Sequence, residues 1–256
     1  MRRWLPLVAL IAIVGCGKKK APEPTATATD PAGGGFVEIS IGEEEEEGLE
    51  GSELMAATAK CGDLVSLEPA AMMGKLKDTE IRCLDDAIRG AEKQTVKDKI
   101  SRVLMSDAWA KGDQHRWEGI VRKHLNEIDR SDPDLCYKFA KYLSEKGPEH
   151  AEETMHWADV ALENRTQWTG DTFVSRVYAL YKLRALASSK NWQALESKYV
   201  AGPSDELLKQ KDRARADAKT LAREWLEYAK QSGKDPTMAM QLCVSAAGNE
   251  DFCSGV

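Results

Sequence analysis

From Ser52 to the C-terminus, apolar residues recur at spacings of three and four, and the strict alternation of a half-buried strand is absent. This spacing places the apolar side chains on one face of an α-helix. Short polar stretches containing glycine, proline or aspartate separate the periodic segments, and helices joined by such short links run antiparallel to their neighbours. The sequence therefore predicts an all-α domain over residues 52–256, built from antiparallel helical hairpins.

Several helix boundaries are marked by single residues. Gly112 is expected to end one helix, Pro133 to open another and Ser204 to cap a long helix near the C-terminus. Residues 171–191 are apolar on nearly every side, which predicts a central helix. Residues 191–199 are expected to form a second helix that pairs with it.

The first residues of the chain have a different character. Arg2 and Arg3 precede an apolar stretch, residues 4–14, that is shorter than the roughly 20 residues needed to cross a bilayer. A charged start, a short apolar middle and small residues before a cut site are typical of a secretory signal. Residues 13–16, IVGC, resemble the lipobox of bacterial lipoproteins, in which a signal peptidase cuts before the cysteine and the cysteine receives lipid.

This resemblance implies that residues 1–15 are removed and that Cys16 carries acyl chains such as palmitate, which hold the protein at a membrane. Gly17 follows the cysteine, whereas aspartate at that position marks inner-membrane retention in enteric bacteria. We therefore expect a location at the outer membrane, facing the periplasm. Residues 16–51 are rich in proline, threonine, glycine and glutamate, a composition that predicts a disordered tether.

The negative charge of the chain is concentrated in one segment. Eight acidic residues and no basic residue lie between Phe36 and Ala56, whereas later residues mix both signs. A nucleic-acid-binding protein would present a concentrated basic face. None is evident in the sequence, so no nucleic-acid partner is expected.

Five cysteines follow Cys16, and export would permit disulfides. Their spacing favours one disulfide between Cys61 and Cys83, across a short helical hairpin, and another between Cys243 and Cys253 at the C-terminal tail. Cys136, on an apolar helix face, is expected to remain a buried free thiol. Other pairings remain open, because spacing alone does not determine connectivity.

Three stretches, residues 108–134, 140–165 and 181–199, resemble tetratricopeptide repeats. Each joins an aromatic or leucine-bearing helix to a second helix with alanine and aromatic residues. The repeats are degenerate, since Trp117 and Thr154 stand where a small residue is usual and His124 replaces a later alanine. The resemblance implies a short α-solenoid, with a compact helical bundle as the alternative architecture.

The sequence carries no recognisable catalytic or cofactor motif. It lacks a phosphate-binding loop and a nucleophile elbow. Glu153 and His156 have the spacing used in helical di-metal sites, but the second copy that such sites need is missing. We therefore expect no enzyme activity, no metal and no cofactor, and the sequence identifies no small-molecule substrate.

Arrays of helical hairpins generally act by holding peptides or other proteins. The sequence therefore predicts a membrane-anchored scaffold for an envelope protein complex. The candidate partner-binding residues on the first helices of the hairpins are Lys138, Lys141, Tyr142, Arg176 and Arg184. The alternatives are a degenerate envelope enzyme or glycan binder, with a pocket between helices near Glu153, and a purely structural bundle.

Tryptophan is abundant, and most indoles, including Trp109, are expected to face the core. Trp168 is different because it lies in a loop between two helices. It is either an exposed anchor for a partner or a lid that folds back on its own hairpin.

Overall fold

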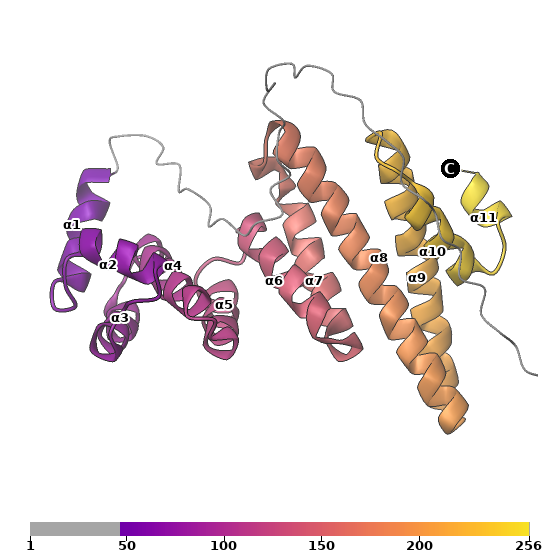
Figure 1. The fold of residues 1–256 in the computed structure, drawn as a ribbon, viewed down its shortest axis with the longest axis horizontal. Coiled ribbons are helices and arrows are strands. Elements are labelled where there is room, and N and C mark those ends of the chain that lie inside the picture. The colour runs from indigo at the N-terminus through magenta and orange to yellow at the C-terminus, as the bar shows by residue number, and fades with distance from the viewer. Residues whose placement is uncertain (1–46, 256) are drawn as a thin grey trace, which may run out of the picture. The chain divides into compact units, whose positions relative to one another are not determined.

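The computed structural model describes residues 47–255, and this part of the chain is all-α, as the apolar spacing predicts. Successive helices pack against one another in pairs (Figure 1), and no strand occurs between residues 47 and 255. The signal sequence, the lipidation site Cys16 and most of the expected tether lie outside the described residues.

Eleven α-helices and two short 3-10 helices form the described part of the chain. They are α1 (Glu47–Thr58), α2 (Leu64–Met72), α3 (Asp78–Gly90), α4 (Gln94–Ala110), α5 (Gln114–Glu127), α6 (Pro133–Lys146), η1 (Pro148–His150), α7 (Ala151–Glu163), η2 (Arg165–Gln167), α8 (Gly170–Ala201), α9 (Asp205–Gln231), α10 (Thr237–Ala247) and α11 (Asp251–Ser254). The expected domain boundary at residue 52 thus falls inside α1.

The marked boundaries coincide with helix ends. Gly112, with a φ of +70°, follows α4, and the Ser204 side chain accepts a hydrogen bond at the start of α9. Pro133 occupies the first position of α6, where its missing N–H costs nothing. The preceding Asp132 side chain accepts hydrogen bonds from the backbone N–H groups of Asp134 and Leu135, which caps the helix.

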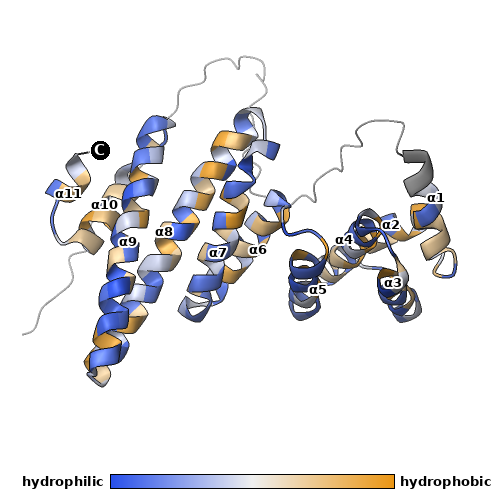
Figure 2. Cartoon of the chain, turned by 180° about the vertical axis from the view of Figure 1, so that it is seen from behind, coloured by the Kyte–Doolittle hydropathy of each residue, from blue (hydrophilic) through white to orange (hydrophobic). Residues whose placement is uncertain are grey.

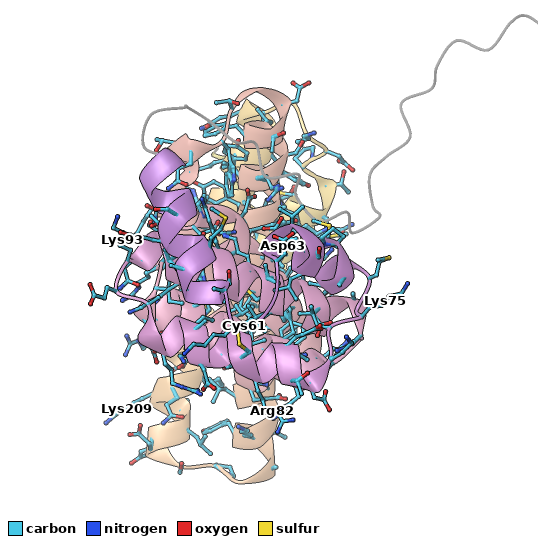
Figure 3. The ribbon with its side chains drawn as sticks, turned by 90° about the vertical axis from the view of Figure 1, so that its left-hand side faces the viewer. Cys61, Asp63, Lys75, Arg82, Lys93 and Lys209 are labelled. Carbon is cyan, nitrogen blue, oxygen red and sulfur yellow. A yellow bond between two sulfur atoms is a disulfide. The ribbon has the colours of Figure 1, made fainter. Side chains whose placement is uncertain are left out.

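Helices α1 to α4 enclose an apolar cluster. Its buried members are Leu54, Leu67, Ala71, Leu76, Leu84, Ile88, Val96, Ile100, Val103 and Leu104. The disulfide between Cys61, which follows α1, and Cys83, on α3, closes this group with the expected pairing (Figure 3). A covalent link therefore supplements a small core.

A buried carboxylate joins α4 to its neighbours. Asp107 is 0% exposed, and its side chain accepts a hydrogen bond from the backbone N–H of Leu76 at 3.1 Å. Lys111 Nζ and Arg116 Nη1 lie 2.9 and 2.8 Å from its other oxygen. Because a buried charge is stable only with such partners, Asp107 fixes the segment after α2 against α4 and the start of α5.

Aromatic rings are prominent in the next cluster, formed by the end of α4 and by α5 to α8. The ring centroids of Trp117 and Tyr142 are 4.9 Å apart, and those of Phe139 and Trp157 are 6.0 Å apart. The first of these pairs is edge-on and the second is tilted, and the quadrupoles of the rings favour such arrangements. The α6–α7 hairpin packs on α8 through this cluster.

The prediction of two helices that meet near Asn191 is wrong, because α8 is one continuous helix of 32 residues. The sequence between Gly170 and Gly202 contains no glycine or proline to end it. Trp192, just past the expected break, is buried with Ala214 and Ala218 of α9. The third repeat-like stretch, residues 181–199, therefore lies within a single helix.

The C-terminal helices pack on α9. Figure 2 shows both hydrophobic and hydrophilic bands along this helix, as expected for an amphipathic helix, and Trp225 and Leu226 on it are fully buried. A disulfide between Cys243 and Cys253 ties α10 to α11, again with the expected pairing. Each buried cluster draws mainly on helices close in sequence, so packing is largely local along the chain.

Candidate functional site

The structure places Trp168 inside the fold. Its side chain is 7% exposed, within the core formed by α5 to α8. Its indole N–H donates to Asp134 Oδ1 at 3.2 Å, and the Arg176 guanidinium lies 5.7 Å from the ring. Trp168 is therefore a lid on its own hairpin, and the expectation of an exposed anchor at this position is wrong.

The two arginines expected to contact a partner hold helices of this chain together instead. Arg176, on α8, forms an ion pair with Asp134 of α6. Arg184, also on α8, lies 2.6 Å from Asp159 of α7 and 2.8 Å from Glu224 of α9. Both guanidinium groups are thus engaged between helices and are poorly placed to bind another protein.

The remaining three candidates lie on α6. Tyr142 is buried, and its hydroxyl donates to Glu118 Oε2 at 3.1 Å. Lys138 is half-buried, and burial lowers the pKa of its amine, with nearby Asp134 opposing the shift. Only Lys141 is exposed as a contact residue would be. The six predicted residues therefore do not form one exposed surface.

Arginines recur between carboxylates at several helix junctions. Arg102, on α4, binds Asp98 one turn earlier at 2.9 Å and the α6 cap Asp132 at 2.8 Å. Arg122, on α5, binds Glu118 one turn earlier at 2.8 Å and also pairs with Glu153 of α7. In both cases the second carboxylate comes from a later element, so the arginine joins successive parts of the fold.

Glu118 and Glu153 both bind Arg122, and two neighbouring carboxylates are what a glycosidase-like site would require. Burial alone would raise the pKa of Glu118, but hydrogen bonds from Lys146, Arg122 and Tyr142 outweigh it and lower this pKa to about 2. A carboxyl group with so low a pKa is ionised at neutral pH and cannot act as a general acid. The arrangement therefore favours a structural ion-pair cluster.

A second constellation contains the residue types of a nucleophile–base–acid triad. Ser101 Oγ on α4 lies 2.5 Å from His124 Nδ1 on α5, and Asp98 Oδ1 lies 3.4 Å from the other ring nitrogen. Burial lowers the pKa of His124, with Asp98 opposing the shift, so the imidazole is neutral near pH 7. Ser101 and His124 are buried, where no substrate has access, so this contact joins two helices.

The other reactive groups are also engaged or sequestered. Cys136 is buried, and burial raises the pKa of its thiol to about 12, which makes it unreactive. Among the described residues, no group of three or more histidine, cysteine, aspartate or glutamate side chains is placed to hold a metal ion.

Exposed apolar side chains are concentrated near the start of the fold. Of the seven large apolar residues most exposed in the described part of the chain, five lie between residues 55 and 109. Four of these lie on α2, just after it, or at the end of α4. They are Val65, Met72, Met73 and Trp109, which we call the α2 surface.

Trp109 does not face the core as expected, because it is 46% exposed. The positions of α4 just before it are buried on all sides, including Met105 one turn earlier on the same side of the helix, so Trp109 is exposed because it lies in the last turn of α4. The Trp109 ring is tilted against Trp117, with the ring centroids 5.1 Å apart, and it lines a shallow hollow of about 230 Å³ with Gly112 and Gln114. The exposed tryptophan is therefore a helix-end residue, and the loop tryptophan is buried.

Sequence reasoning missed the α2 surface, although one signal was present. The segment LVSLEPAAM, which forms α2, contains a single charged residue and has apolar residues on both helix faces. Such a helix is usually buried on both sides.

No family model matches the chain, and comparisons with curated proteins and with solved structures give no match.

Proposed function

We propose that this chain is a lipid-anchored scaffold of the bacterial envelope that holds other proteins close to the membrane. The lipobox-like motif ending at Cys16 supplies the anchor. Among residues 47–255, no helix is long and apolar enough to cross a bilayer. The two disulfides are compatible with an oxidising compartment outside the cytoplasm, and Gly17 favours the outer membrane, facing the periplasm.

The observation that carries the proposal is the α2 surface. Clustered, exposed large apolar side chains on a folded protein commonly mark a site of interaction. The second repeat-like stretch, residues 140–165, contains part of α6, a turn and α7, and the first, residues 108–134, contains the end of α4, a turn and α5; we propose that they are degenerate tetratricopeptide-like units. Arrays of such units present binding surfaces for proteins.

A degenerate enzyme or glycan binder has less support from the side-chain arrangement. The carboxylates nearest to a catalytic pair share Arg122. The Ser101–His124 contact is buried. Both clusters act between helices, whereas the exposed surface is apolar and suited to a protein partner.

The test is crosslinking of the full chain in intact cells of its own organism, followed by detergent extraction, affinity purification and mass spectrometry. The matched control is Cys16→Ser, which removes the proposed lipid acceptor and leaves residues 47–255 unchanged. We expect the same set of envelope proteins to co-purify with the natural chain in every replicate and to be depleted with the control. Recovery of the chain alone would contradict a scaffold function.

A further inference from the structure

Helix α2 has one buried and one exposed apolar face. Leu67 and Ala71 are buried against the neighbouring helices, whereas Val65 and Met72 are exposed. Val65 and Met72 are seven residues apart and so lie on the same side of the helix, within about 20° of each other. The outer face of α2 is thus an apolar helix face with no partner among the described residues.

The end of this face adjoins the exposed indole. A Cβ atom on Gly74, which has a φ of +64°, would lie only 3.1 Å from backbone atoms of Ala110 and Lys111. Lys111 Nζ also donates to the carbonyl oxygen of Leu76 at 2.7 Å. The segment after α2 is therefore in direct contact with the end of α4, so Met73 and Trp109 lie on adjoining backbone segments.

Charge is unevenly distributed around the surface. Lys75 and Lys77, both exposed, lie two and four residues after Met73, and Figure 3 shows Lys75 at the edge of this part of the fold. The Lys77 ammonium lies 3.6 Å from Glu80 Oε1. Glu68, also exposed, lies in the middle of α2 on the side of Val65 and Met72. The end near Trp109 thus carries two exposed ammonium groups, one of them paired with Glu80, and the centre carries one acidic group.

We propose that the α2 surface binds an amphipathic helix of an envelope protein, with acidic residues at the end that faces Lys75 and Lys77. The apolar face of the bound helix covers Val65, Met72 and Met73, and Trp109 is its anchor. Methionine side chains are flexible and polarisable, and they suit surfaces that receive helices. The opposite charges pair across the rim and set the orientation of the bound helix. This inference rests on the proposed scaffold function.

Two other occupants fit the charges less well. Insertion of the surface into a bilayer would take Glu68 into the apolar region, which is costly for a carboxylate. A second copy, packed antiparallel through α2 on a two-fold axis, would place the two Glu68 side chains opposite each other, because Glu68 is the central residue of α2. A partner helix avoids both conflicts.

The test is a photo-crosslinking amino acid placed at Met73 in the full chain, in the envelope of its own organism. Val200 is the matched position, because it is also apolar and exposed but lies at the end of α8, remote from α2 in sequence. We expect irradiation to join Met73 to one other polypeptide through a segment with apolar residues three and four apart and acidic residues at one end. Trp109→Ala should lower the yield of this adduct at least about tenfold.

Circular dichroism of the Trp109→Ala chain is the check that this variant remains folded. Lys75→Glu with Lys77→Glu should lower the yield in the same way. A lipid adduct, a crosslinked dimer or no adduct at Met73 would overturn the inference. Protein adducts at Val200 without any at Met73 would contradict a binding site on the α2 surface but would remain consistent with the scaffold function. Absence of protein adducts at both positions would overturn the site and count against the scaffold function.

Discussion

Replacing Asp107 with alanine should lower the free energy of unfolding by about 3 kcal/mol. A buried N–H left without its acceptor, here that of Leu76, costs about 1–3 kcal/mol. Removing one partner of a buried ion pair costs about 3–5 kcal/mol. The side chains of Lys111 and Arg116 are 31% and 23% exposed, so water can solvate their charges in part once the carboxylate is gone. The expected cost therefore lies at the lower end of these ranges.

Thermal unfolding followed by far-ultraviolet circular dichroism measures this cost. For a domain of this size, about 1 kcal/mol corresponds to about 2–4 °C, so the midpoint should fall by roughly 6–12 °C. Asp107→Asn keeps an oxygen for the Leu76 N–H and should cost less than alanine.

The matched control is Asp86→Ala, which removes a carboxylate paired with Arg89 at the surface. These two side chains are 71% and 63% exposed, and such pairs contribute about 0–1 kcal/mol. If Asp107→Ala costs no more than Asp86→Ala, then Asp107 does not hold α2, α4 and α5 together and the reasoning is refuted.

Three further predictions concern other parts of the fold. The pKa of Glu118 is about 2 in the folded protein against an ordinary 4.5, so the ionised carboxylate stabilises the fold above pH 4.5 and this stabilisation is lost as the pH falls toward 2. In urea titrations at several pH values, Glu118→Gln should reduce the loss of unfolding free energy in acid by about 1 kcal/mol, after allowance for solvent screening. An unchanged pH profile would contradict this role of Glu118. Replacing Cys61 and Cys83 with serine should cost about 3 kcal/mol, and an unchanged urea midpoint would show that the disulfide adds nothing. Trp225→Ala should cost about 3–5 kcal/mol. Trp109→Ala should cost only about 1–2 kcal/mol, because its indole is 46% exposed but contacts Trp117; equal losses would mean that both indoles are core residues.

The helices themselves could be predicted because their signals are local. The spacing of apolar residues and single residues such as Pro133 and Ser204 act over one or two turns. The expected break near Asn191 failed for a local reason as well. Polar residues in a helix do not end it when no glycine or proline follows and Trp192 can bury itself against α9.

The surface could not be predicted in the same way, because burial depends on partners far away in sequence. Trp168 is buried through Asp134, 34 residues earlier. Arg184 is engaged by Glu224, 40 residues later. Neither distance can be inferred from helical periodicity, so long polar and aromatic side chains that looked available for a partner are used within the fold.

The mass of the N-terminal peptide of the chain purified from membranes tests the central claim most directly. The account predicts a peptide that begins at Cys16 and carries the added mass of two or three acyl chains. A chain that still begins at Met1, or a cysteine at position 16 without lipid, would contradict a lipid-anchored scaffold.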